Sequence, residues 1–343
     1  MPHMPSPRIF FTGIFSLLVA SASAEVNKVE NIAPDVYFHE GDITGKGHCN
    51  NGWVVFEDYV LVIDANFPSG AEEVIPKIKK LTNKPIRFAF DTHHHGDHAY
   101  GNQVWVDNGA TPVAHTGVVE ELNKYEPKRW NDTAKDRKDV AASKLKYPTL
   151  LFPKELFFDD TKHRVELHHF GVAHTHGDGF AWLPKERILF TGDACVNGAY
   201  NFVGDGNIQE WIETLEAAKK LNPKIVCPGH GPMGDATVLD NQQEFFRELL
   251  LHAKKLATEA DPKSAVEKIR AEMQKNQRIA RYIGGGFPSQ LEKAHIELGG
   301  KAFLSRSVRA SEEEKHLLAH GHDHGHDHEH PHRQSPKAIL NSK

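Results

Sequence analysis

Asp91 to His98 reads DTHHHGDH, and this stretch decides how the rest of the chain is interpreted. It holds His93, His95, Asp97 and His98 in the pattern H-x-H-x-D-H. Because side chains alternate along an extended segment, His93 and His95 point the same way and can bind one metal ion. Asp97 and His98 can reach around the following turn to a second ion. Imidazole suits zinc, copper, iron or nickel, and a carboxylate keeps such a site hard enough to hold a hydroxide.

The segments on either side place this cluster at the end of a buried strand. PIRFAFD, which precedes it, is rich in β-forming apolar residues, and AYGN, which follows it, is typical of a turn or the start of a helix. Open α/β sheets place their sites at the C-terminal ends of strands. The alternative, a histidine-rich surface loop, does not fit these flanks.

Composition allows one large domain or two small ones. The chain has 343 residues, is 39% hydrophobic and carries a formal charge of −5. The mild acidity gives no electrostatic reason to expect a nucleic-acid partner. Cys49, Cys195 and Cys227 make an odd count, which leaves at least one thiol outside any disulfide within the chain. All three are expected to be small buried hydrophobic residues.

The N-terminus has the pattern of an export signal. Arg8 gives a positive start, Ile9 to Ala20 is apolar, and Ala22 to Ala24 reads A-x-A, a cleavage site. Residues 1–24 are therefore predicted to be a signal peptide, and the mature chain to be periplasmic or secreted. The apolar run is shorter than the about 20 residues that a membrane span needs, so no stable membrane insertion is expected after cleavage.

The other end is of low complexity. His316 to His332 alternates histidine with Gly, Asp and Glu, a composition that cannot form a packed core. Residues 306–343 are predicted to be a disordered His-rich tail. It either captures additional metal ions or serves only solubility.

Between these ends, strand-rich blocks alternate with helical blocks. Short β-branched runs fill Val36 to Asn66, and residues 71–83 have helical spacing. Four further strands are expected between about residues 155 and 193, and residues 208–221 carry one apolar helical stripe. Lys128 to Ser143 is charged and is interpreted as a helical or loop insertion near the mouth of a cleft. Two strand-rich blocks, each followed by helices, favour two packed sheets with helices outside.

Three later segments repeat the form of the first cluster, a β-like run that ends in a possible ligand. They end on His174 in FGVAHTHGD, Asp193 in RILFTGD and His230 in KIVCPGHG. Each alone is weak, since a single histidine after a strand is more often structural. Together with the first cluster they give enough ligands for two metal ions with three ligands each and one shared carboxylate.

With these seven positions, the chain resembles the metallo-β-lactamase superfamily of αβ/βα hydrolases. The seven ligand positions occur in that family's order and rough spacing, over about Val36 to Glu259. Asp64 in VIDAN matches a position that supports the ligand loop from behind. The resemblance implies an α/β fold, a four-layer αβ/βα sandwich, over residues 25–260. A C-terminal helical extension is expected over 261–305.

The resemblance also assigns a role to each ligand. It gives metal 1 to His93, His95 and His174, metal 2 to Asp97, His98 and His230, and the bridge between them to Asp193. Two zinc ions are the expected cofactor, although iron and manganese accept the same ligand types. A metal-bridging hydroxide would attack the substrate, and the catalytic Asp97 would orient it and pass its proton to the leaving group. The other histidines near these positions are not assigned as ligands. His94 is expected to point away from the metals and either to support the ligands from behind or to face solvent.

The expected substrate is a small molecule, and the residue at position 193 narrows its class. Asp193 departs from the best-known antibiotic-hydrolysing branches, which place Cys or Ser there, so β-lactams are not the expected primary substrate. The carboxylate resembles that of glyoxalase II-like thioesterases, lactonases and phosphodiesterases. THHHGDHAYGN and PGHGP most resemble exported hydrolases of the sulfur-oxidation and quinoprotein-associated type. Two alternatives stay open: a persulfide dioxygenase-like enzyme with a single iron, and a periplasmic zinc-buffering protein that acts through its His-rich tail.

Overall fold

The computed structural model describes residues 25–256, 258 and 261–305. The predicted signal peptide and the predicted His-rich tail lie outside these residues, so both stay predictions. Among the residues described, no helix is both long enough and apolar enough to cross a membrane.

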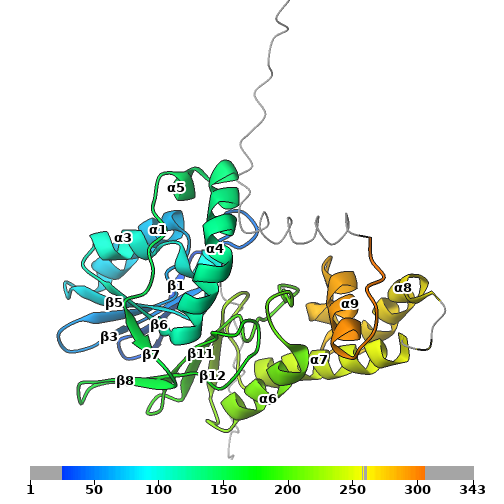
Figure 1. Ribbon diagram of the computed structural model, residues 1–343. Coiled ribbons are helices and arrows are strands. Elements are labelled where there is room, and N and C mark those ends of the chain that lie inside the picture. The colour runs from blue at the N-terminus through cyan, green and yellow to red at the C-terminus, as the bar shows by residue number, and fades with distance from the viewer. Residues whose placement is uncertain (1–24, 257, 259–260, 306–343) are drawn as a thin grey trace, which may run out of the picture.

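Two sheets pack face to face and form the centre of the fold (Figure 1). The first sheet has seven strands in sequence order, antiparallel from β1 to β4 and parallel from β4 to β7. Its strands are β1 (Val29–Ala33), β2 (Val36–His39), β3 (Asn51–Val55), β4 (Val60–Ile63), β5 (Ile86–Asp91), β6 (Thr111–His115) and β7 (Leu150–Phe152). The second sheet has the order β12-β11-β10-β9-β8. Its strands are β8 (Glu155–Asp159), β9 (Arg164–His168), β10 (Phe180–Leu183), β11 (Ile188–Gly192) and β12 (Ile225–Pro228).

Alternation along the strands produces a separate apolar layer on each face of the first sheet. Val54 and Leu61 face the second sheet and pack in one cluster with Phe190. Their chain neighbours Trp53 and Val62 point the other way and pack against the helices outside. This period-2 pattern buries both faces, as expected for a sheet enclosed in a sandwich.

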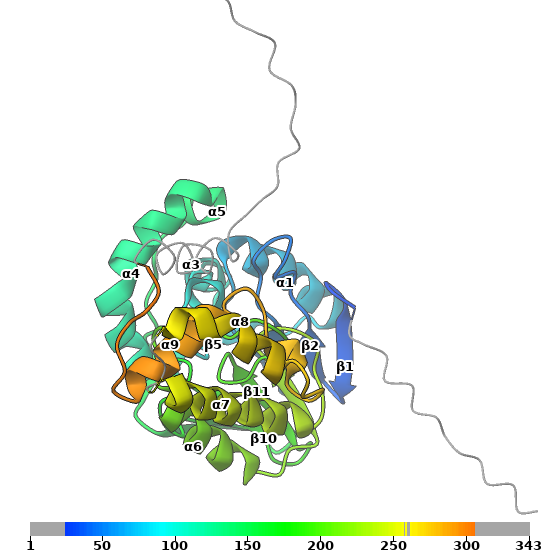
Figure 2. The same ribbon diagram turned by 90° about the vertical axis from the view of Figure 1, so that its right-hand side faces the viewer.

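Helices cover the outer face of each sheet (Figures 1 and 2). On the side of the first sheet lie α1 (Pro68–Leu81), α2 (Gly96–Ala99), α3 (Asn102–Asp107), α4 (Thr116–Asp136) and α5 (Lys138–Ala141). On the side of the second sheet lie α6 (Ile208–Lys219), α7 (Thr237–Leu256), α8 (Pro262–Met273), the 3-10 turn η1 (Ala280–Tyr282) and α9 (Phe287–Glu297). The layer order helix, sheet, sheet, helix confirms the predicted αβ/βα sandwich. The predicted C-terminal helices are present and share a core cluster with α6 and α7.

The charged segment Lys128 to Ser143 is mainly helical, which is one of the two forms expected of it. Helix α4 runs through Pro127 to Asp136, and α5 follows it. The proline removes one backbone hydrogen bond. The buried side chains of Leu122 and Glu126 nevertheless anchor the middle of this helix against the rest of the protein.

The ends of several strands meet at one edge of the sandwich and bring the predicted ligand segments together. Strand β5 ends at Asp91, just before His93, and β11 ends at Gly192, just before Asp193. Gly192 has a φ of +50°, and a Cβ there would lie 2.2 Å from the hydroxyl oxygen of Thr92. Only glycine allows this close approach between the two sheets.

Candidate metal centre

All seven predicted ligands are buried and converge at this edge. None is more than 7% exposed. Their ligand atoms form overlapping groups that could each hold a metal ion: His93, His95 and His174; Asp97, His98 and His230; and His93, His98 and Asp193. Two neighbouring sites joined by Asp193 account for all of these groups.

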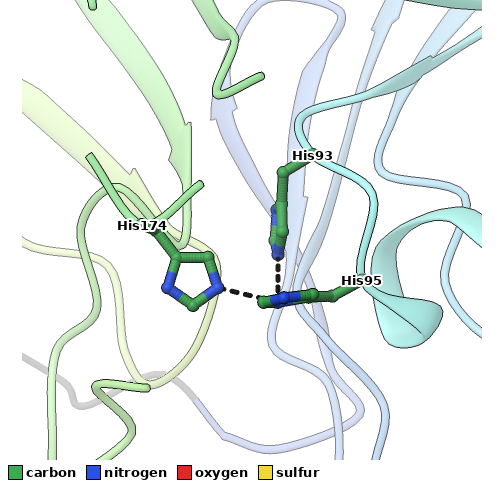
Figure 3. A group of neighbouring side chains, drawn as sticks. All are labelled: His93, His95 and His174. Carbon is green, nitrogen blue, oxygen red and sulfur yellow. Dashed lines mark hydrogen bonds between the residues drawn. The ribbon is translucent and has the colours of Figure 1, made fainter. Parts of the chain in front are cut away.

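The first triad consists of three imidazoles whose nitrogens face one another (Figure 3). Nδ1 of His95 lies 3.2 Å from Nε2 of His93 and 2.8 Å from Nε2 of His174. For comparison, ligands of a tetrahedral zinc ion with Zn–N bonds of about 2.0–2.1 Å stand roughly 3.3 Å apart. The spacing therefore fits three ligands of one small cation.

The far nitrogen of each imidazole in this triad has an acceptor of its own. Nδ1 of His174 donates to the carbonyl oxygen of Phe202 at 2.9 Å, and Nε2 of His95 donates to Oδ2 of Asp205 at 2.9 Å. Nδ1 of His93 lies 3.2 Å from the hydroxyl of Thr92, which itself donates elsewhere and can accept this proton. Because each far nitrogen holds the proton, the three nitrogens at the centre present lone pairs, as metal ligands must.

The second triad combines two imidazoles with a carboxylate. Oδ2 of Asp97 lies 3.0 Å from Nε2 of His230 and 3.3 Å from Nε2 of His98. Nδ1 of His98 lies 3.1 Å from Oδ2 of Asp64, whose other oxygen accepts hydrogen bonds from the backbone and hydroxyl of Thr92. Asp64 thus supports the ligand loop from behind, in the position expected of it.

Asp193 reaches ligands of both triads. Its Oδ1 lies 3.3 Å from Nε2 of His98, and its Oδ2 lies 3.3 Å from Nε2 of His230 and 3.8 Å from Nε2 of His174. This position between the triads suits a carboxylate that bridges two cations.

In the metal-free chain, the pKa values of the ligand histidines are lowered in the first triad and raised in the second. Burial lowers the pKa of His174 to about 4 and, with neighbouring imidazoles, holds the pKa values of His93 and His95 well below the usual value, so the first triad is neutral. Burial also opposes the protonation of His230, but Asp193 and Asp97 raise its pKa to about 9. The second triad therefore favours positive charge, which a divalent cation supplies.

His94 lies behind the ligands in a network of carboxylates, which is the first of the two arrangements expected of it. It is fully buried rather than solvent-facing, and its Nδ1 lies 3.1 Å from Oε2 of Glu121 on α4. Asp205 lies on its other side, with Oδ2 3.5 Å from Nε2 of His94. The same carboxylate accepts two hydrogen bonds from Arg129, at 2.5 and 2.9 Å. Asp205 thus connects the ligand His95 with α4.

Several of the remaining histidines and the thiol of Cys195 lie apart from the centre, whereas the thiol of Cys49 lies within 4.8 Å of ligand atoms of Asp64 and His98. His115 and His169 stack on each other with ring centroids 3.8 Å apart, and His176 is exposed. Sγ of Cys195 is buried 3.6 Å from the carbonyl oxygen of Val238, so this thiol turns into the core beneath α7.

A cavity of about 220 Å³ opens beside the two triads. His95 and Asp97 form its inner end, and side chains of α4 form one long wall. Part of the segment Lys128 to Ser143, expected near the mouth of a cleft, contributes to that wall through Lys128, Arg129, Asp132 and Thr133.

Comparison with known proteins supports one family. The model of the Metallo-beta-lactamase superfamily matches residues 44–230, more than half of the chain. "Metallo-beta-lactamase type 2" of Bacillus cereus is 25% identical over 62% of this chain and 79% of its own length. The protein of the same name from Elizabethkingia meningoseptica is 24% identical over 64% of this chain and 85% of its own. The solved structure of a metallo-beta-lactamase from Pontibacter korlensis superposes with a TM-score of 0.55 at 20% identity, covering 64% of this chain and 98% of that one.

Proposed function

The chain belongs to the metallo-beta-lactamase superfamily, whose members are mostly metal-dependent hydrolases, and from this premise we propose that it is an exported dinuclear-zinc hydrolase of small ester, thioester or lactone-like substrates. The observation that carries the dinuclear proposal is the pair of buried triads that share Asp193. Nitrogen and oxygen donors suit zinc, and three protein ligands for each ion leave a coordination position open. Iron or manganese could occupy the same donors.

Zinc bound at these ligands supplies Lewis acidity and lowers the pKa of water from 15.7 to about 7. The protein's own contribution is to orient and move protons. The Asp97 carboxylate, 3.0 Å from Nε2 of His230, faces the shared space between the triads and also lines the cavity. In our proposal it accepts a proton from the attacking water and delivers it to the leaving group.

The proposed substrate is smaller than an antibiotic. Relatives from Bacillus cereus and Elizabethkingia meningoseptica bear the name metallo-beta-lactamase, which makes β-lactams the first substrate to exclude. The cavity, about 220 Å³, is below the roughly 300–1,000 Å³ typical of sites for drug-sized ligands. A carboxylate at position 193 and a small cavity together favour a compact ester, thioester or lactone.

Two alternative functions would require a different metal content or other residues. A persulfide dioxygenase-like enzyme needs one iron, whereas the second triad is as deeply buried as the first. A zinc-buffering role would depend on residues 306–343, which lie outside the described part of the chain.

A hydrolysis screen tests the proposal. The zinc-loaded mature chain is assayed with thioesters, lactones, β-lactams and phosphodiesters, and its metal content is measured. We expect turnover of a thioester or lactone with two metal ions per chain. One iron per chain with oxygen-dependent persulfide consumption would support the first alternative, and fastest turnover of β-lactams would replace the substrate proposal.

The role of Asp97 has its own test. Asp97→Asn should lower turnover by about 10²- to 10⁴-fold, the usual contribution of general acid–base catalysis, while its circular dichroism spectrum stays that of the native chain. The matched control is Asp132→Asn, which removes a carboxylate from the outer part of the same cavity, where it pairs with Lys128 and Lys135. Near-native turnover in Asp97→Asn would refute the assignment.

A further inference from the structure

The cavity has an apolar interior formed by aromatic side chains from separate parts of the chain. Phe67 and Tyr100, both buried, meet edge to face with ring centroids 5.8 Å apart. Tyr125 lies on α4, and Phe202 lies beside the first triad, its ring centroid 5.7 Å from that of His95. Aromatic walls of this kind favour a flat or apolar ligand segment, since each ring offers a large contact area at fixed geometry.

Tyr125 is held in place by charged and aromatic neighbours. Its ring stacks on His94 at a centroid distance of 5.6 Å and an interplanar angle of 23°. The Arg129 guanidinium and the Lys124 ammonium each lie 4.5 Å from the same ring centroid. Tyr125 is therefore a fixed wall that joins the interior of the cavity to the cationic outer part of α4.

The cations along α4 differ in how far their charge is compensated. Arg129 is paired with Asp205, and Lys128 is paired with Asp132 at 2.6 Å. Lys124 is exposed and makes no ion pair with a carboxylate of the described chain, although it lines the cavity. Lys124 contacts Tyr125 and is attracted by Glu121 and Asp205 from a distance, but no described carboxylate pairs with it, so it adds a positive charge to a cavity that His95 and Asp97 also line.

The carboxyl group nearest the aromatic walls does not cancel that charge. Glu126 is buried, accepts a hydrogen bond from the hydroxyl of Tyr100, and lies 3.7 Å from Arg129. Its partners are therefore within the cavity wall, and among the described residues it forms no ion pair with Lys124. The cavity thus combines aromatic walls with an exposed lysine that has no carboxylate partner of its own in the described part of the chain.

We propose that the substrate is a small monoanion, with its scissile carbonyl beside Asp97, an apolar or aromatic segment between Phe67, Tyr100, Tyr125 and Phe202, and its anionic group at Lys124. This inference rests on the proposed hydrolase function and adds a substrate class and a specificity residue to it.

The test uses two matched ligand pairs. One pair is a phenylacetyl thioester that carries either a carboxylate or a carboxamide at the far end of its ring. The other pair replaces the thioester sulfur with nitrogen, and the resulting amides serve as slowly reacting binding probes. The full zinc-loaded chain is assayed for kcat/KM with the thioesters and by calorimetry for Kd with the amides.

We expect the carboxylate form to be preferred by about three- to fivefold in both measurements, as for an exposed charge pair. Lys124→Met should abolish that preference, and Lys124→Arg should retain it. The matched control is Lys138→Met, which removes an exposed lysine on α5 that is not among the cavity-lining residues. Equal affinity for the two forms in the native chain, or a preference that survives Lys124→Met, would overturn the inference.

The turnover measurement and the binding measurement test the hydrolase function and the anion site separately. A Lys124-dependent preference in binding without thioester turnover would retain the anion site and refute thioester hydrolysis. Turnover without any preference would retain the hydrolase and refute the anion site.

Discussion

Asp205 is the residue whose replacement tests most directly how the protein tunes its metal centre. Its Oδ2 accepts the hydrogen bond from Nε2 of His95 at 2.9 Å, which fixes the tautomer that leaves Nδ1 of His95 unprotonated. Asp205→Asn keeps the shape but removes the negative charge, so it weakens this bond. Loss of such a partner of a metal-bound histidine costs about 10- to 100-fold in metal affinity, or roughly 1.4–2.8 kcal/mol.

The same substitution should also lower the free energy of unfolding. Arg129 loses a bidentate partner, and the next carboxylate, Glu126, lies 3.7 Å away. Breaking a fully buried pair costs about 3–5 kcal/mol. Because the Arg129 side chain is 22% exposed, water compensates part of this loss, and we expect about 2 kcal/mol in urea unfolding of the metal-free chain.

Zinc affinity is measured by competition with a chromophoric chelator, with circular dichroism as the check on folding. Asp132→Asn is the control, since its pairs with Lys128 and Lys135 are exposed and contribute little to stability. The reasoning is refuted if Asp205→Asn keeps its native spectrum and binds zinc within twofold of the native chain.

Two further substitutions have clear expectations. Asp193→Ala should bind fewer than two zinc ions per chain by elemental analysis, because it removes the carboxylate that reaches both triads; two tightly bound ions would contradict the bridging role. Gly206→Ala should lower the free energy of unfolding by about 1–3 kcal/mol, because its Cβ would lie 1.9 Å from the carbonyl oxygen of Ala173. Gly285→Ala, where nothing lies within 4 Å of the added Cβ, should unfold like the native chain, and equal midpoints for all three proteins would contradict this packing argument.

The sequence was sufficient to predict the layers of the fold and the convergence of seven ligands. Each ligand follows a short β-like run, so a local pattern is enough to find it, and parallel strand ends then meet at one edge. The helices of residues 71–83 and 208–221 were predictable for a similar reason, since one face of each is apolar and buried.

What could not be predicted depends on contacts between distant segments. Asp205 lies in a loop without periodicity and reaches His95 across 110 positions. Two carboxylates beside His94, those of Glu121 and Glu126, come from α4, and the local pattern of that helix does not show that it packs against the ligand loop. The short strands β1 and β7 were also missed, because their pairing with a neighbouring strand, more than their composition, defines them.

The position of Asp205 has a thermodynamic consequence for substrate and metal together. One carboxylate orients the metal ligand His95 and also holds Arg129, which lines the cavity. A ligand that draws Arg129 away from Asp205 alters the acceptor of His95, and so alters zinc affinity. By linkage, zinc must then change the affinity for that ligand by the same factor. Occupancy of the cavity and occupancy of the metal centre are therefore coupled equilibria, and a binding constant for either has meaning only at a stated concentration of the other.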